Sequence, residues 1–203
     1  TRALTRHLRS RGVMMGMVTT QAPEEALARL AELPSYDGTD FVSTVTTQER
    51  YQWDSPAIEM DPEAKYRILV TDCGLKFNIL RLLKQRGCQV IALPATTPPE
   101  DMLALNPSGI LFSPGPGDPQ LLDHLVANAG KLLGRVPLMG ICLGHQLLAH
   151  ALGGRTYKLK FGHRGGNHPV RDERTGLVHI TAQNHGYAVD PDSLPLEVEV
   201  SHT

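Results

Sequence analysis

The 203-residue sequence contains little cysteine, few aromatic residues and almost no excess of charge. Its three cysteines, Cys73, Cys88 and Cys142, include no CxxC pair and leave an odd one in any disulfide scheme, which favours a reducing, cytoplasmic setting. The formal net charge of -1 gives no basic excess for nucleic acid or an anionic membrane surface. No apolar run approaches the roughly 20 residues of a membrane span.

No group of cysteine or histidine residues has the spacing of a metal site, so we expect no metal in the chain. The nine histidines are the one unusual feature of the composition. Hydrophobic residues make up 41% and charged residues 20%, as is ordinary for a globular protein of one or two domains.

The pattern of the chain changes near residue 65. Residues 1–64 hold two short helical patterns, at 1–12 and 22–33, and then a polar stretch that ends in SPAIEMDPEA. We expect residues 1–64 to be the tail of an N-terminal domain with a linker, and not a core. Residues 65–203 are expected to form the second domain. The first residue is not methionine, which indicates a piece of a longer protein.

From residue 66 onward, strand patterns alternate with helical patterns, and this implies an α/β fold with an open, mostly parallel sheet flanked by helices. The predicted strands are 67–73, 88–94, a third beginning at 108 and a fourth at 136; the predicted helices are 76–87, 98–105, 119–134 and 145–154. Further strand-like segments predict an antiparallel extension on one edge of the sheet: 155–160, 167–172, 176–183 and 196–202.

The segment MGICLGHQ places a single cysteine between a strand end and a helix start. Gly140 and Gly144 allow close backbone packing, as in the nucleophile elbow of hydrolases. The start of the helix favours the thiolate of Cys142, and the N–H of Leu143 is placed to bind an oxyanion. A buried, unreactive cysteine is an equally weighted alternative.

Two further loops are candidates for ligand binding. In SPGPGDP, Gly115 and Gly117 leave backbone N–H groups open to a ligand, although a plain strand-to-helix turn capped by Asp118 explains the same residues. Because the carboxyl ends of parallel strands share one rim, this loop should face the same side as the cysteine. In AQNHGYAV, Asn184 before Gly186 indicates a tight turn, which fits an amino-acid site or a simple hairpin equally.

The motifs GICLGHQ, SPGPGDP and QNHGYAV together resemble the class I, triad-type glutamine amidotransferases. More narrowly, TDCGLKFNILRLL, KLKFGHRGGNHPV and QNHGYAVD resemble the small subunit of carbamoyl-phosphate synthase, and TRALTRHLR resembles the end of its N-terminal domain. The resemblance covers essentially the whole chain. It implies a class I amidotransferase-like sheet that is incomplete at its C-terminal side.

The resemblance implies a glutaminase in which Cys142 attacks the amide of L-glutamine through a thioester and releases ammonia. The ammonia would pass to a large subunit, which makes carbamoyl phosphate from bicarbonate and ATP for arginine or pyrimidine synthesis. ATP and magnesium would therefore belong to that partner, and no cofactor is expected in this chain.

The resemblance also assigns the site residues. The N–H groups of Leu143 and Gly115 would form the oxyanion hole. Glutamine would be held by Gly115, Gly117, Leu143, Gln146, Asn184, Gly186 and Tyr187. Tyr187 stands where family members often carry phenylalanine, and the loop has Pro114 before Gly115 where they commonly have Asn-Gly-Pro-Gly.

The proton acceptor of the family is a histidine in a GHPE motif, and none of the nine histidines is followed by Pro-Glu. His145 lies three residues after Cys142 and is expected to point away, and His185 lies on the predicted glutamine turn. We therefore expect the catalytic histidine and glutamate beyond Thr203, and negligible glutaminase activity from these 203 residues alone.

Two alternatives remain open. One is another triad-type amidotransferase, serving GMP, anthranilate or CTP synthesis, and the other is a non-catalytic glutamine-binding scaffold. The segment FGHRGGNHPV and the N-terminal residues favour carbamoyl phosphate over the first. The presence of Cys142 favours chemistry over the second.

Overall fold

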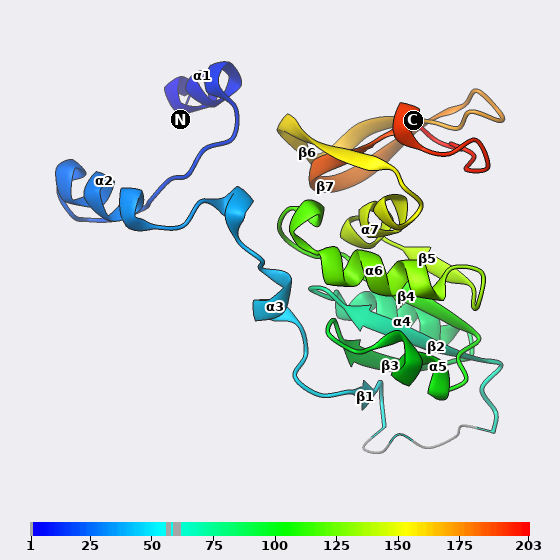
Figure 1. Cartoon of the computed structure of the whole chain (residues 1–203). Coiled ribbons are helices and arrows are strands. Elements are labelled where there is room, and N and C mark those ends of the chain that lie inside the picture. The colour runs from blue at the N-terminus through cyan, green and yellow to red at the C-terminus, as the bar shows by residue number, and fades with distance from the viewer. Residues whose placement is uncertain (1, 56–57, 59–61) are drawn as a thin grey trace. The chain divides into compact units, whose positions relative to one another are not determined.

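The structure, a computed structural model, describes residues 2–55, 58 and 62–203 (Figure 1). It forms two compact units, which are described separately. The sheet unit comprises Asp40–Thr156 and Val189–Val198, and the hairpin unit comprises Thr1–Thr39, Tyr157–Ala188 and Glu199–Thr203. The predicted boundary between residues 64 and 65 falls inside the sheet unit. As a boundary between domains of the protein it stays a prediction.

The sheet unit is built on five strands in the order β1-β3-β2-β4-β5. Four of them pair in parallel, as the alternating pattern predicted: β2 (Tyr66–Asp72), β3 (Cys88–Pro94), β4 (Gly109–Phe112) and β5 (Leu138–Gly140). The chain passes from β2 to β3 on one side and then crosses back to β4 on the other. The carboxyl ends of β2 and β4 therefore flank the point where such sheets bind ligands.

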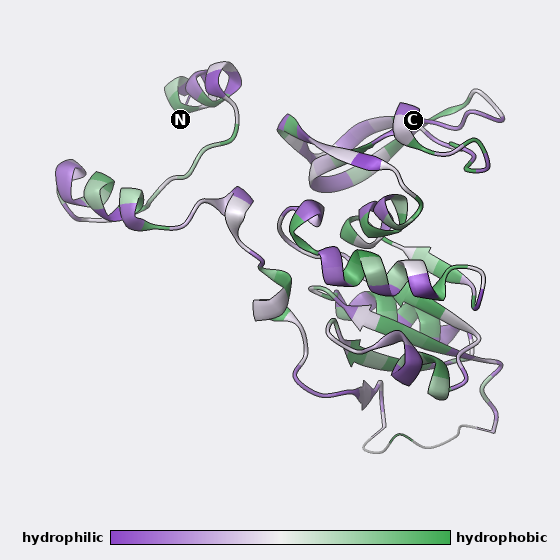
Figure 2. Ribbon diagram, viewed as in Figure 1, coloured by the Kyte–Doolittle hydropathy of each residue, from purple (hydrophilic) through white to green (hydrophobic). Residues whose placement is uncertain are grey.

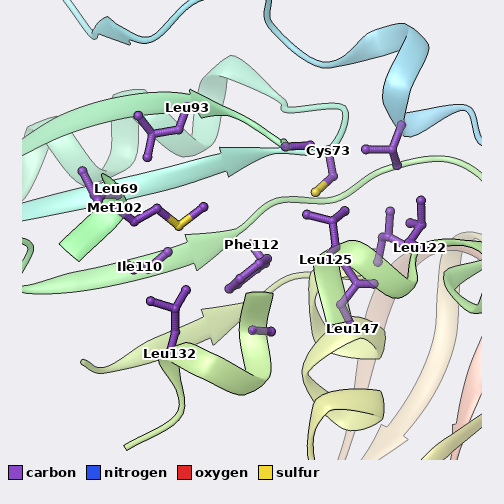
Figure 3. Close-up of a cluster of buried hydrophobic side chains, with 14 of the residues drawn as sticks. Leu69, Cys73, Leu93, Met102, Ile110, Phe112, Leu122, Leu125, Leu132 and Leu147 are labelled. Atoms are coloured by element: carbon purple, nitrogen blue, oxygen red, sulfur yellow. The ribbon is translucent and has the colours of Figure 1, made fainter. Parts of the chain in front are cut away.

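Side chains that alternate along the strands cover both faces of this sheet. Leu69, Ile91 and Phe112 belong to a cluster that packs with α5 (Pro99–Ala104), α6 (Asp123–Leu132) and α7 (Leu143–Ala151), shown in Figure 3. The residues between them, including Val70, Val90 and Leu111, pack with Leu80 of α4 (Phe77–Gln85) in a second cluster. Burial on both faces explains why the strands are almost continuously apolar.

The predicted helix 119–134 is divided into η2 (Pro119–Leu121) and α6. Leu122 between them has φ -111° and ψ 42°, which is not helical. The Asp118 carboxylate accepts a hydrogen bond from the N–H of Gln120 and thereby caps the first short turn. The chain then restarts as a helix at Asp123.

The expectation that the polar stretch before residue 65 contributes no core is wrong. Val42, at the start of α3 (Val42–Val45), is fully buried in the first cluster. The N–H of Ala95 donates to Thr46 Oγ1 at 2.8 Å. An edge strand, β1 (Tyr51–Gln52), pairs antiparallel with β3. These few contacts could not be predicted from the sequence, because the stretch around them is mostly polar. Residues 56, 57 and 59–61 of this stretch lie outside the described part of the chain.

The hairpin unit is named for β6 (Arg155–Arg171) and β7 (Val178–Asp190), which form a two-stranded sheet of their own. The first two residues of β6 and the last two of β7 are counted with the sheet unit. Antiparallel strands are present as predicted. They do not extend an edge of the parallel sheet, however, because β6 and β7 pair only with each other. The segments 155–160 and 167–172, however, are one strand. The predicted strand 196–202 is wrong, because that segment follows η3 (Pro191–Ser193) as turns and forms only the isolated bridge of His202 with Asp172.

The two predicted N-terminal helices are present as α1 (Arg2–Arg11) and α2 (Pro23–Glu32), and η1 (Tyr36–Gly38) follows. No residue of α1 or α2, which the structure describes in full, is buried. Figure 2 shows the contrast, with a largely hydrophilic α1 and hydrophobic strands in the parallel sheet. Among the described residues, no helix combines the length and apolar character needed to cross a bilayer.

Candidate active site

Cys142 lies on a strained turn between β5 and α7. It caps α7 with φ 55° and ψ -109°, in a region that side chains other than glycine rarely adopt. A Cβ atom on Gly144 would lie 2.1 Å from the carbonyl oxygen of Phe112, and one on Gly140 would lie 2.3 Å from the carbonyl carbon of Gly144. The turn therefore requires both glycines, for the reason of close backbone approach that the sequence indicated.

The loop after β4 meets this turn, as the shared rim predicted. A Cβ atom on Gly115 would lie 2.2 Å from the carbonyl oxygen of Cys73 and 2.6 Å from Leu143 Cδ2. Gln146 is buried one turn into α7, and its N–H donates to the carbonyl of Cys142 at 3.1 Å. The two predicted oxyanion donors thus come from segments in direct contact. Their role toward an oxyanion stays a prediction, as does that of Gln146 toward glutamine.

A third turn, which the sequence analysis did not single out, follows β2 and packs on the same loop. Gly74 has φ 126°, and a Cβ atom there would lie 3.0 Å from Pro116 Cδ and 3.2 Å from Gly115 Cα. Gly117 also has a positive φ, of 93°. These glycines let the turn after β2 and the loop after β4 lie against each other.

The thiol of Cys142 is half-buried, and this burial raises its pKa above the ordinary value. A hydrogen bond from the N–H of Leu143 and the positive charge of Lys76 act in the opposite direction. The contribution of the Leu143 N–H has the direction expected from the helix start. The net pKa shift is nevertheless upward, because loss of hydration outweighs it.

Lys76 is a further candidate site residue, which the sequence analysis did not name. It caps α4, which begins just after the carboxyl end of β2, on the rim that also carries Cys142. Its ammonium is the positive charge that stabilises the Cys142 thiolate. A lysine soon after a buried strand, in TDCGLKFN, was the available signal.

Cys73 is unsuited to nucleophilic chemistry. Its side chain is fully buried at the end of β2, and burial raises its pKa to about 12. Figure 3 shows its sulfur among the core side chains, on the side of Phe112 and Leu125. Cys88 is buried too, so Cys142 alone of the three cysteines, all described, is partly exposed.

The remaining predicted residues, Asn184, Gly186 and Tyr187, lie in the hairpin unit on β7. The tight turn predicted there is wrong, because β7 is continuous from Val178 to Asp190. The ring of His185 bonds along the strand, with Nδ1 2.8 Å from the carbonyl oxygen of Tyr187 and Nε2 2.8 Å from Gln183 Oε1. A role for these residues in one pocket with Cys142 stays a prediction.

Tyr187 is buried, while Asn184 is exposed. The hydroxyl of Tyr187 donates to Asp37 Oδ1 at 2.9 Å, and the same carboxylate pairs with Lys158. The pKa of Asp37 is lowered, mainly because Lys158 donates a hydrogen bond to its carboxylate. Burial acts in the opposite direction, and the bond from Tyr187 adds to the lowering. The hydroxyl that distinguishes Tyr187 from phenylalanine therefore holds the short helix η1 on the hairpin.

His145 is exposed on the first turn of α7. Both ring nitrogens of His185 are bonded within the hairpin unit, as described above. That neither histidine accepts the proton of Cys142 stays a prediction. Within residues 2–55, 58 and 62–203, no group of three or more His, Cys, Asp or Glu side chains could hold a metal ion.

Comparison with solved structures reveals the same fold. The chain is similar to a putative GMP synthase subunit from Thermoplasma acidophilum, with a TM-score of 0.57 and 22% identity over 68% of this chain and 72% of that one. It is also similar to a glutamine amidotransferase from Thermotoga maritima, with a TM-score of 0.52 and 21% identity over 68% of this chain and 66% of that one.

Sequence relatives are considerably closer. The chloroplastic carbamoyl phosphate synthase small chain of Arabidopsis thaliana is 48% identical over 100% of this chain and 49% of its own length. The carbamoyl phosphate synthase small chain of Akkermansia muciniphila is 46% identical over 99% of this chain and 55% of its own length. The chain thus spans about half the length of these relatives. Residues 69–203 match the family described as glutamine amidotransferase class-I, and the chain belongs to that family.

Proposed function

We propose that this chain is the glutamine-hydrolysing part of a carbamoyl-phosphate synthase small chain. Identity of 46–48% over essentially the whole chain to relatives of that name supports the proposal. The observation that carries it is the conformation of Cys142, whose φ of 55° holds a half-buried sulfur at the start of α7 beside the loop of Gly115. Strain of this kind is retained where it serves a reaction.

In the proposed reaction, the sulfur of Cys142 attacks the side-chain carbonyl carbon of L-glutamine. The carbonyl oxygen gains negative charge and is held by the N–H groups of Leu143 and Gly115. In the resting site the Leu143 N–H bonds the sulfur, so it is already directed to the reacting atoms. The C–N bond then breaks, the nitrogen takes up the proton that the thiol lost and leaves as ammonia, and water hydrolyses the thioester to glutamate and the thiol.

The thiol has to lose its proton in this step, because the pKa of Cys142 is raised. Lys76 stabilises the thiolate once it has formed, but its positive charge cannot take up the proton. We propose that the acceptor is a histidine of the family's GHPE motif, which these 203 residues do not contain.

We further propose that the ammonia is passed to a large subunit that binds ATP and magnesium, and that this chain itself uses no cofactor. The product, carbamoyl phosphate, would serve arginine or pyrimidine synthesis. A reducing, cytoplasmic setting is supported by the three cysteines, which are all described and form no disulfide.

The test is covalent labelling by the chloroketone analogue of L-glutamine, followed by peptide mass spectrometry. We expect the label on Cys142, and protection by L-glutamine but not by L-glutamate at equal concentration. The Cys142→Ala variant provides the control. Labelling that L-glutamine does not slow would overturn the proposal. Binding of the purified chain to a carbamoyl-phosphate synthase large chain, and not to the ATP-binding part of a GMP synthase, would separate the two amidotransferase assignments.

A further inference from the structure

Asp72, at the carboxyl end of β2, is a buried carboxylate to which the proposed reaction gives no role. Its exposed fraction is 8%. One oxygen, Oδ1, accepts hydrogen bonds from the N–H groups of Gly74 at 2.9 Å and Leu75 at 2.8 Å. The other, Oδ2, accepts from the N–H of Thr47 at 3.0 Å. A buried carboxylate with three backbone donors fixes the conformation of the segments that supply them.

Ser113, at the carboxyl end of β4, continues this set of bonds across the rim. Its hydroxyl is fully buried, accepts from the N–H of Cys73 at 2.9 Å and donates to the carbonyl of Pro114 at 2.9 Å. Asp72 therefore stabilises the turn after β2 by accepting hydrogen bonds from that turn's own backbone. Ser113 connects the turn to the loop that begins at Pro114.

The turn held in this way touches the predicted oxyanion donor. A side chain at Gly115 would collide with the carbonyl oxygen of Cys73, and one at Gly74 would press tightly on the Gly115 backbone. Movement of the turn would therefore displace the Gly115 backbone.

We propose that Asp72, acting with Ser113, is a positioning residue that holds the turn of residues 73–76 against Gly115, so that the Gly115 N–H is fixed for the oxyanion. This inference rests on the proposed function. Asp72 touches neither glutamine nor the sulfur in this scheme. It acts only through the backbone that it binds.

The bonding pattern explains why the position needs a carboxylate. An asparagine oxygen could still accept from Gly74 and Leu75, but its NH₂ group would then face the N–H of Thr47, donor against donor. Asp72→Asn is therefore a nearly isosteric change that breaks the bond to Thr47 and weakens the hold on the turn. Ser113→Ala breaks the link at another point without any change of charge.

The experiment compares two reagents on the full 203-residue chain. The chloroketone analogue of L-glutamine needs its carbonyl oxygen held as an oxyanion, whereas iodoacetamide alkylates a thiolate by direct displacement. We expect Asp72→Asn and Ser113→Ala to slow chloroketone labelling of Cys142 by about tenfold to a hundredfold, since small misplacements of catalytic groups have effects of this order. The iodoacetamide rate should stay within about twofold of the unmodified chain, and its pH midpoint should move by no more than about 0.3 pH unit.

The matched control is Asp190→Asn. This aspartate also accepts a backbone N–H two residues ahead, from Asp192 at 3.2 Å, and its other bond goes to Arg155. It should leave both labelling rates unchanged. The proposal is overturned if both variants label with the chloroketone at the unmodified rate. It is also overturned if the rates with the chloroketone and with iodoacetamide fall by the same factor, because Asp72 and Ser113 would then have a structural role only.

If Asp72→Asn does not fold by circular dichroism, Ser113→Ala decides by the same criteria. Failure of the proposed function looks different. In that case the unmodified chain itself would show no glutamine-protected labelling, whatever the variants do.

Discussion

The turns after β2 and after β5 each carry a cysteine at the carboxyl end of a parallel strand, yet only one presents its sulfur for reaction. Cys73 continues the direction of β2 into the core and is fully buried. Cys142 follows a strand of three residues and adopts φ 55°, which keeps its side chain partly exposed at the helix start. The residue type and the place in the sheet are the same, and the backbone conformation makes the difference.

The surroundings of the two turns extend this contrast. Gly140 and Gly144 remove the side chains that would keep strand, turn and helix apart around Cys142. Around Cys73, the neighbouring Asp72 and Ser113 instead fix the backbone by hydrogen bonds. The turn of Cys142 leaves its sulfur partly exposed, whereas the turn of Cys73 packs against the neighbouring loop of Gly115. The loop of Gly115 lies between them.

The largest expected effect is on covalent labelling. Cys142→Ala should abolish labelling by the chloroketone analogue of glutamine, because the other two cysteines are buried. Cys73→Ala should retain the label while lowering the free energy of unfolding by about 1–2 kcal/mol, as expected when a buried sulfur is removed. Mass spectrometry and urea unfolding measure the two quantities. Label on Cys73 in the folded Cys142→Ala chain would contradict the conclusion that only the turn of Cys142 presents its sulfur for reaction.

The second effect concerns the glycine that makes the Cys142 turn possible. Gly144→Ala places a Cβ atom 2.1 Å from the carbonyl oxygen of Phe112, so helix and strand must separate. We expect a loss of about 2–4 kcal/mol of unfolding free energy and at least about a tenfold slower labelling.

The matched control is Gly130→Ala in α6, where an added Cβ meets no atom within 4 Å. Since alanine is the better helix former, this variant should gain about 0.5–1 kcal/mol. Chemical denaturation of both variants measures the difference. Equal stability changes at the two glycines would contradict the close approach at Gly144.

The contrast between the turns also shows how far the sequence alone can lead. Continuous apolar strands predicted the parallel sheet, and the spacing of Gly140 and Gly144 predicted the elbow, because both depend on local pattern. The sequence also predicted that the loops carrying Gly115 and Leu143 would meet, since strand ends share one rim. These features follow from periodicity and topology.

Other features depend on contacts between distant segments and were missed for that reason. The hydrogen bond from the N–H of Thr47 to Asp72 joins residues 25 positions apart. No local pattern in the polar stretch predicts it. The net direction of the pKa of Cys142 depends on how much water the folded site excludes. The predicted turn at Asn184 is wrong because β7 continues through it from Val178 to Asp190 and pairs with β6, a segment distant in the sequence.

The third effect is on the pH dependence of alkylation. Because burial raises the pKa of Cys142, its rate with iodoacetamide should keep rising beyond the ordinary thiol midpoint of about 8.5. Lys76→Gln removes a positive charge that favours the thiolate, so the midpoint should move further up, by less than about one pH unit. Lys84→Gln, near the other end of α4, should leave it in place. A midpoint that falls in Lys76→Gln would contradict the assigned role of Lys76. Cys73, with a pKa of about 12, should remain unlabelled throughout.

The smallest effect tests the backbone strain itself. At Cys142, glycine can adopt φ 55° and ψ -109° without the strain of about 1–3 kcal/mol that other residues carry there. Cys142→Gly should therefore be more stable than Cys142→Ala by about 1 kcal/mol, after the entropy that glycine adds to the unfolded chain is counted. At Cys73, whose φ is not positive, the order should reverse, and alanine should be the more stable by about 0.5–1 kcal/mol. Urea unfolding of the four variants measures both differences. The same order at both positions would mean that strain does not distinguish the two turns, and that exposure of the sulfur alone accounts for its reactivity.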